Sequence, residues 1–484
     1  MTKHFARLAG IAALAVLVHG YHLGVDDAEI YVPAIKRVAD PALYPFGSEF
    51  FLSHARLSLF PNLVGGSARL AHVPADFAIF AWHAIGVFLL LAAGWRLACA
   101  CFESNGARWS AVALLAASFS IPAAGTALVV MDPYLTARTL SAPAALFAVA
   151  CYGSNQPKRA LAWLAFAALV HPQMFLFAVA LIGIAVALGR LRPAVPAPVF
   201  GALSVLPLLF DWHPATGAAR EALIARTYFF VYNWAWYEWL GVAAPLALLA
   251  WASRAHFRKT TPAFRLLARA LVVFGLLATA AGMALATSPR FENLARLQPM
   301  RGFHLLYAVF FVMLGGLIGE YALKARAWRW AALFGPAAIG MWFLGSAAYP
   351  ASPHVEWPGA RGANTWTSAF YWIRAHTPKD AIFALDPDYM AAADDDQHGF
   401  RAVAERSALA DRLKDSGVAS LFPGIANEWK AEVEAERGWR SFQEADFERL
   451  AQRFPVTWAV VRRPAPAGMP CPYRNAELAV CRIK

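Results

Sequence analysis

The chain has 484 residues, of which 59% are hydrophobic and only 15% are charged. Soluble globular proteins carry about 25% charged residues, so the composition excludes an ordinary soluble protein and indicates an integral membrane protein. The formal net charge of +12 does not indicate a nucleic-acid partner, because the basic residues collect in short loops whose expected neighbour is anionic membrane lipid.

The charged residues are sorted between alternate loops. Every second loop between apolar stretches is basic, and the intervening loops hold most of the acids that precede the tail. The basic positions are Lys3, Arg7, Arg96, Arg108, Lys158, Arg159, Arg190, Arg192, Arg254, Arg258, Lys259, Arg265, Lys324, Arg326 and Arg329. The positive-inside rule assigns these loops to the cytoplasm. The sequence therefore predicts a multi-pass protein of a bacterial inner membrane, with a cytoplasmic N-terminus and an extracytoplasmic C-terminal domain.

Apolar stretches approaching the length that crosses a membrane, about 20 helical residues, recur through residues 1–348. They predict about eleven transmembrane helices, near residues 5–23, 77–101, 109–130, 139–152, 159–171, 173–189, 195–211, 233–253, 264–286, 302–323 and 328–348. The first is interpreted as a retained signal anchor, since no small-x-small cleavage pattern precedes the acids that follow it.

The first outer loop, residues 24–76, is too long for a simple connector, and its apolar content predicts short helices that lie on the membrane surface near 30–38 and 50–70. Asp26, Asp27 and Glu29 open this loop. Three acids at the membrane surface are candidates for a general base or for ligands of a divalent cation. A solvated loop that only helps to set the topology is the alternative.

Three later residues on the outer side are also candidates for substrate binding. Arg138 opens a predicted span, so its guanidinium must pair, reach the membrane surface or meet a ligand. Asp132 is its nearest acidic neighbour in sequence, and a structural ion pair between the two is the alternative. His171 lies at a break between two short spans, where an ordinary core histidine is the alternative to a functional one.

The last outer loop is basic, against the general pattern. Its cations include Arg296 and Arg301, and His304 follows Arg301 by one helical turn, so the last two side chains share a face. Arginine binds phosphate with bidentate geometry. These residues are therefore candidates for binding a phosphate at the membrane surface, and pairing with acids such as Glu292 is the alternative.

Residues 349–484 have the composition of a soluble domain. Helices are predicted over 365–376, 402–414 and 428–453, and strands over 381–385, 457–461 and 476–482, which is typical of a small α/β domain. Cys471 and Cys481 lie close together in the sequence. Outside the cytoplasm they would form a disulfide that closes a terminal hairpin.

Several segments resemble the GT-C superfamily of polytopic membrane glycosyltransferases. The first loop carries the resemblance in Asp26-Asp27-Ala28-Glu29, in Tyr31 to Ile35 and in Asp40 to Pro45, and further short matches are Asp132 to Arg138 and Leu297 to Arg301. The resemblance implies a GT-C-like helical fold. It also implies transfer of a sugar from a polyprenyl-phosphate-linked donor to a glycan, lipid or protein acceptor, with inversion at the anomeric carbon.

The resemblance also implies roles for the residues at the matching positions. The base would be Asp26 or Asp27, Arg301 would bind the carrier phosphate, and a divalent cation such as Mg or Mn remains an alternative at the first-loop acids. Two other functions stay open. A transporter would place ionisable residues near the middle of its spans, whereas these gather at the outer ends. A non-catalytic member of the same fold would have a binding or assembly role.

Overall fold

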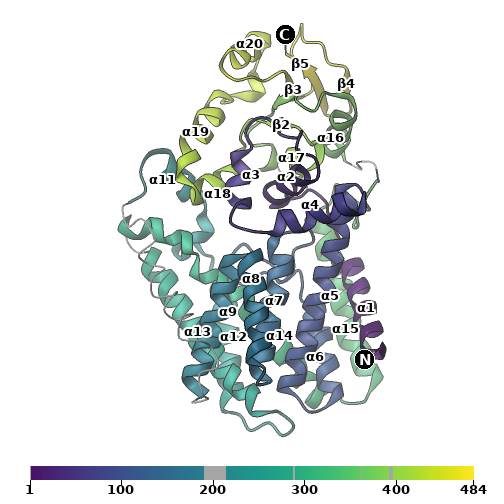
Figure 1. The fold of residues 1–484 in the computed structure, drawn as a ribbon, viewed down its shortest axis with the longest axis vertical. Helices are drawn as coiled ribbons and strands as arrows, with labels where there is room; N and C mark the ends of the chain where they lie inside the picture. The colour runs from purple at the N-terminus through teal and green to yellow at the C-terminus, as the bar shows by residue number, and fades with distance from the viewer. Residues whose placement is uncertain are drawn as a thin grey trace.

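The computed structural model describes residues 2–189, 214–286, 289–360, 362, 364–391 and 396–483. Figure 1 shows the long helices side by side in the lower part of the molecule, with the C-terminal residues gathered around a small sheet above them. The N-terminus lies at the lower end of the helices, and the C-terminus lies at the far upper end of the molecule.

Five segments of the described residues are long and apolar enough to cross a membrane. They are α5 (Ala75–Cys101), α9 (Pro172–Gly189), α13 (Pro262–Ala286), Arg290–Leu323, which contains α14 (Gly302–Leu317), and α15 (Ala327–Ala348). Shorter helices pack with them, namely α1 (Thr2–His19), α6 (Asn105–Ala117), α7 (Ala137–Gly153), α8 (Pro157–Val170) and α12 (Trp236–Arg254). The predicted α-helical polytopic membrane fold is therefore confirmed.

Short elements connect these helices. They are α11 (Gly217–Ile224), η2 (Thr227–Phe229), η3 (Val231–Asn233), η4 (Pro289–Leu297), η5 (Pro299–Arg301) and the π-helical η6 (Ile318–Leu323). The helix predicted over 109–130 was wrong in its second half, because α6 ends at Ala117. Irregular turns follow, closed by a β-bridge between Pro122 and Val129. Pro122 lacks an N–H for helix continuation, and Ala124 has a φ of 53°, outside the helical region.

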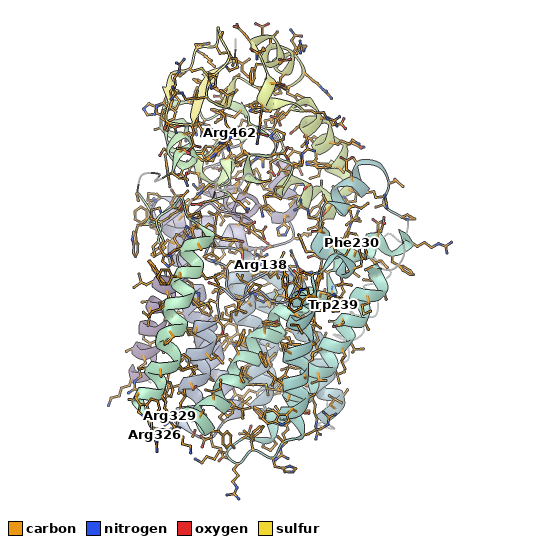
Figure 2. The ribbon with its side chains drawn as sticks, turned by 180° about the vertical axis from the view of Figure 1, so that it is seen from behind. Arg138, Phe230, Trp239, Arg326, Arg329 and Arg462 are labelled. Atoms are coloured by element: carbon orange, nitrogen blue, oxygen red, sulfur yellow. A yellow bond between two sulfur atoms is a disulfide. The ribbon has the colours of Figure 1, made fainter. Side chains whose placement is uncertain are left out.

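The two kinds of loop lie at opposite ends of the helices. At the N-terminal end, Arg7 lies over the ring of Trp109, and Lys259 pairs with Glu320 at 2.6 Å. Figure 2 labels Arg326 and Arg329 at this same end, which we call the basic end. The opposite end carries the C-terminal domain and is called the tail end. The predicted span 195–211, together with Arg190 and Arg192, lies outside the described residues.

The first outer loop forms three short helices rather than two. They are α2 (Ala28–Ala39), α3 (Glu49–Ala55) and α4 (Phe60–Ala71). The helix predicted at 30–38 lies within α2. The one predicted at 50–70 is divided. α3 ends at Ala55, and α4 begins at Phe60 with Pro61 in its first turn, a position where the missing N–H of proline costs nothing.

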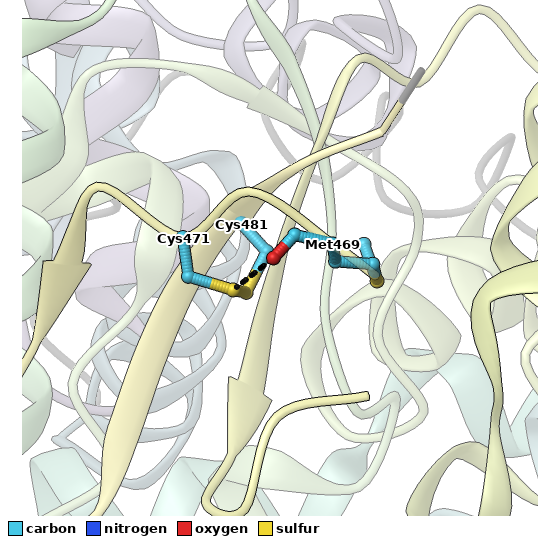
Figure 3. The surroundings of a disulfide bond; sticks show 3 residues. All are labelled: Met469, Cys471 and Cys481. Atoms are coloured by element: carbon cyan, nitrogen blue, oxygen red, sulfur yellow. Dashed lines mark hydrogen bonds between the residues drawn. A yellow bond between two sulfur atoms is a disulfide. The ribbon is translucent and has the colours of Figure 1, made fainter. Parts of the chain in front are cut away.

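The tail contains a mixed five-stranded sheet in the order β2-β1-β3-β5-β4. The strands are β1 (Ile382–Ala384), β2 (Ser407–Ala408), β3 (Trp458–Arg462), β4 (Tyr473–Arg474) and β5 (Leu478–Arg482). β1 runs parallel to β2 and β3, whereas β5 is antiparallel to β3 and β4. Cys471 and Cys481 are joined by a disulfide across ten residues, as predicted, and the Cys471 Sγ lies 3.4 Å from the carbonyl oxygen of Met469 (Figure 3).

Helices surround this sheet. They are α16 (Thr365–His376), η7 (Tyr389–Ala391), α17 (Phe400–Ala404), α18 (Lys414–Leu421), η8 (Pro423–Ile425), α19 (Ala426–Ala435), η9 (Trp439–Ser441) and α20 (Glu444–Arg453). The predicted helix 365–376 is α16, and the asparagine before it caps the first turn. The predicted helix 402–414 was wrong. Glu405 has a φ of 56° and ends α17, and Ser407 then pairs with β1. The predicted helix 428–453 is broken at Gly438, whose φ is 81°.

The first loop packs into the tail rather than lying free on the membrane. The Lys36 ammonium donates to the carbonyl of Ala402 at 2.8 Å, and the Tyr44 hydroxyl donates to the carbonyl of Arg401 at 2.9 Å. Phe50 is buried in one cluster with apolar residues of α18 and α19. The boundary proposed at residue 349 therefore separates two stretches of chain, while residues 24–76 contribute to the packing of residues 349–484.

Candidate active site

The acidic motif lies in a tight turn between α1 and α2. Asp26 has a φ of 53°, which aspartate tolerates better than most residues. Its N–H donates to the carbonyl of Gln397 at 3.1 Å, and Val25 forms a β-bridge with His398. The turn is thus held by the tail, and it directs Asp26 and Asp27 away from Glu29.

Asp26 and Asp27 share a lysine that the sequence did not suggest. The Lys414 ammonium, at the start of α18, contacts Asp26 and lies 3.3 Å from Asp27 Oδ1. The Tyr134 hydroxyl donates to the second oxygen of Asp26 at 2.9 Å. The lysine side chain is only 10% exposed, whereas the carboxylates are 36% and 25% exposed. These two acids are therefore accessible to a small molecule, and the tail supplies the cation that holds them together.

Arg138 connects Asp27 to the helix bundle. It lies in the first turn of α7 and is almost fully buried. Its Nη2 donates to Asp132 at 2.9 Å and to Asp27 at 3.1 Å, and its Nε donates to Asp132 at 3.2 Å. The ion pair between Asp132 and Arg138, the structural alternative for these residues, is present. Figure 2 shows Arg138 between the helices and the tail. The same guanidinium also pairs with Asp27 of the first loop.

Arg301 provides a second cation beside Arg138. Its guanidinium lies over the ring of Tyr228, 5.2 Å from the centroid, and its buried Nε has no hydrogen-bond partner. Within the described residues, no carboxylate pairs with Arg301. The charges of Arg138 and Arg301 act together on the rings of three histidines, which are His54, His171 and His304. The five side chains therefore surround one region at the tail end.

The histidines line the site, and they do not supply its positive charge. His171 ends α8, and its Nδ1 accepts the N–H of Met174 in the first turn of α9 at 3.4 Å. His304 contacts the backbone of Val129 and Val130. Burial lowers the pKa of His54 to about 4, although the nearby Asp27 raises it, so this imidazole is neutral at ordinary pH. The positive charge of the region comes from the two arginines and from the protonated form of Lys414, whose pKa is lowered to about 7 by burial.

Glu29 does not take part in this site. Its Oε1 accepts from the Arg401 backbone N–H at 3.0 Å and from the Arg401 guanidinium at 3.3 Å, and its Oε2 accepts from the Ala402 N–H at 2.9 Å. Burial raises the pKa of Glu29 to about 7. We therefore interpret Glu29 as a buried link between the first loop and the tail, and not as the base or metal ligand considered from the sequence.

The donor set does not fit the divalent cation considered for the first loop. Mg²⁺ and Mn²⁺ require several oxygens around one point, whereas Glu29 is directed to Arg401. Asp26 and Asp27 already have Lys414 between them, and Asp27 also pairs with Arg138. No group of three or more metal-binding side chains occurs within the residues that the structure describes. The negative charge of this motif is balanced by side-chain cations.

No protein-family model matches the chain, and no curated protein matches it. Its layout is similar to that of ArnT. The comparison is with the crystal structure of ArnT from Cupriavidus metallidurans in the apo state, and it covers 100% of this chain and 98% of that one. The sequence identity is 13% and the TM-score is 0.39, so the function must be inferred from the residues of this chain.

The structure brings together most of the predicted site residues. Asp26, Asp27, Asp132, Arg138 and Arg301 lie in one region with His171 and His304, whereas Glu29 lies apart. Arg296 is on η4, and its role stays a prediction. Sequence reasoning missed Lys414, Tyr134 and His54. The sequence contained a signal for His54, a histidine in a segment of otherwise apolar character near the acidic motif, and Tyr134 lies inside the matching segment Asp132 to Arg138.

Proposed function

We propose that this protein is a membrane glycosyltransferase that transfers a sugar from a polyprenyl-phosphate-linked donor to a glycan, lipid or protein acceptor. One observation supports the proposal above the others: the accessible first-loop Asp27 pairs with the buried Arg138, and the half-buried Arg301 lies in the same region at the tail end. The arrangement places a proton acceptor beside cations suited to a phosphate. The sequence resemblance to GT-C enzymes supplies the class of reaction.

Arg301 is the best candidate for the donor phosphate. Arg301 is half-buried, and its buried Nε has no hydrogen-bond partner, so a phosphate would satisfy both the charge and this N–H group. Arg138 is less available because Asp132 and Asp27 already accept from it. We assign Arg138 to orienting Asp27, and Arg301 to the leaving phosphate.

Asp27 is the proposed base. The acceptor hydroxyl would attack the anomeric carbon as its proton passes to Asp27, forming the new carbon–oxygen bond. The bond from that carbon to the phosphate oxygen breaks on the opposite side, and the electron pair leaves with the polyprenyl phosphate. Arg301 stabilises the charge that develops on the phosphate. Attack opposite to the leaving group inverts the anomeric centre.

Asp26 and Lys414 are proposed as positioning residues. Asp26 is held on one oxygen by Lys414 and on the other by Tyr134, so it fixes the turn that carries Asp27. Lys414 belongs to the tail, which makes the tail part of the site. We propose that the tail end faces the outside of the cell and the basic end faces the cytoplasm, which agrees with the positive-inside rule.

The test is sugar transfer from labelled polyprenyl-phosphate donors by the purified full chain in liposomes. Asp27→Asn should reduce turnover about 100-fold or more, the usual range for loss of a general base, while donor binding is kept. The matched control is Asp40→Asn, because Asp40 is also a first-loop acid but pairs with Lys379 outside the site.

Four outcomes are decisive. Loss of turnover in Asp27→Asn with normal Asp40→Asn supports the proposed base. Loss in Asp26→Asn alone would exchange the roles of the two acids and contradict our assignment. A wild-type chain that binds the donors without turnover would refute the enzyme and favour a non-catalytic binding role. Movement of the intact donor across the bilayer would favour a transporter instead.

A further inference from the structure

A cavity lies at the basic end, far from the candidate active site. Its volume is about 980 Å³, within the range of small-molecule sites. The wall is formed by the end of α5, the turn between α7 and α8, the end of α9 and the start of α13. Because these elements meet on the side opposite to the tail, a ligand here would come from the other leaflet of the membrane or from the other aqueous phase.

The cavity is positively charged. Arg265 and Arg269 line it from one face of α13, one helical turn apart. Neither pairs with a carboxylate among the described residues, and the nearby Glu320 is engaged by Lys259 and Ser104. Two like charges at this spacing repel each other. An anion between them would remove the repulsion.

Two helix starts add to this charge. α8 begins at Pro157 and α13 begins at Pro262, and both residues line the cavity. The N-terminal end of a helix carries a partial positive charge and unpaired N–H groups. The cap residue of α8, Gln156, makes no side-chain capping bond. The cavity thus combines two arginines with two helix N-termini, which is suited to a phosphate.

The remaining wall mixes polar side chains with an apolar strip. Ala100, Leu188, Ala263 and Leu266 contribute hydrocarbon surface next to the polar groups. A free inorganic anion would leave this surface unused, whereas an amphiphile would cover it. We propose that the cavity binds the phosphate headgroup of a phospholipid from the leaflet at the basic end, with the start of its acyl chains along Leu188 and Leu266.

The test measures lipid retention by the purified full chain in a neutral detergent. Dioleoylphosphatidylglycerol is added, and bound lipid is counted by native mass spectrometry. We expect a retained lipid in the wild type and at least a ten-fold loss of occupancy in Arg265→Gln/Arg269→Gln. The matched control is Arg326→Gln/Arg329→Gln, which removes the same charge from the same end outside the cavity. Equal retention in both double variants would overturn the proposal.

A second measurement needs no arginine variant. Cys99 lines the cavity and is half-buried, while Cys101 and Cys151 are buried. Bound phosphatidylglycerol should slow maleimide labelling of Cys99 several-fold, and Cys99→Ser identifies that signal. Protection by inorganic phosphate alone to the same extent would assign the site to a free anion. Protection by dioleoylglycerol, which has no phosphate, would show that the arginines do not select the ligand. Either result would refute the phospholipid assignment.

Discussion

Replacing Lys414 by methionine tests whether the tail holds the first-loop acids Asp26 and Asp27 in position for activity. The ammonium lies 3.3 Å from Asp27 Oδ1 and also contacts Asp26. At this separation the attraction is about 1 kcal/mol in water and about 5 kcal/mol at an effective dielectric of 20. Because the Asp27 side chain is 25% exposed, we take the lower end, about 1–2 kcal/mol. Loss of this energy from the transition state corresponds to about a 5- to 30-fold change in rate.

The expected result is a partial loss of activity rather than complete inactivation. Without the ammonium, the turn that carries Asp27 loses a contact with the tail, so kcat/KM should fall about 5- to 30-fold. The assay is the initial rate of sugar transfer at limiting donor concentration. Lys414→Arg should restore most of the activity. Lys379→Met removes a tail lysine paired with the first-loop Asp40 and should leave kcat/KM unchanged. An unchanged kcat/KM in Lys414→Met would refute the reasoning.

Three further predictions follow from the structure. Arg301→Ala should raise KM for the donor at least ten-fold, and Arg301→Lys should restore only part of it, since a lysine cannot form the bidentate contact; equal KM values in initial-rate assays would contradict this role. Burial raises the pKa of Glu29 from 4.5 to about 7, so the folded chain keeps a proton that the unfolded chain loses, and stability should fall by up to about 3 kcal/mol as pH rises through this window. Glu29→Gln should remove this part of the pH dependence of the unfolding midpoint, and parallel curves for both chains would show that Glu29 titrates normally. Reducing the disulfide, which closes a ten-residue loop, should destabilise the tail by about 2–3 kcal/mol in denaturant unfolding, and Cys471→Ser should then show no response to reductant.

The helices were predictable because long apolar runs report directly on burial in lipid. Residues 77–101 and 264–286 coincide with α5 and α13 to within a few residues. Prediction failed where local geometry overrode composition. The end of α6 depends on Pro122 and on the positive φ of Ala124, and β2 was hidden in a segment of helical composition. Such short elements are stabilised by pairing with distant strands and carry little local signal.

The candidate site was predictable in part for the same reason. Charged residues at the ends of apolar runs stand out in the sequence. Asp26, Asp27, Arg138 and Arg301 were identified for this reason. Lys414 could not be found, because its contact with Asp27 joins residues 387 positions apart. Nor did the sequence separate Glu29 from its two neighbours. That distinction depends on the turn at Asp26, which places one acid in the core of the tail and the others at its surface.

The interlocking of the first loop with the tail affects how this protein is made. Glu29 bonds to Arg401 across 372 residues, so a ribosome would finish almost the whole chain before the buried acid met its partner. Until then, the contacts that Lys36, Tyr44 and Glu29 make with the tail could not form. A premature stop codon near the end of the gene would therefore damage the beginning of the protein as well as its end.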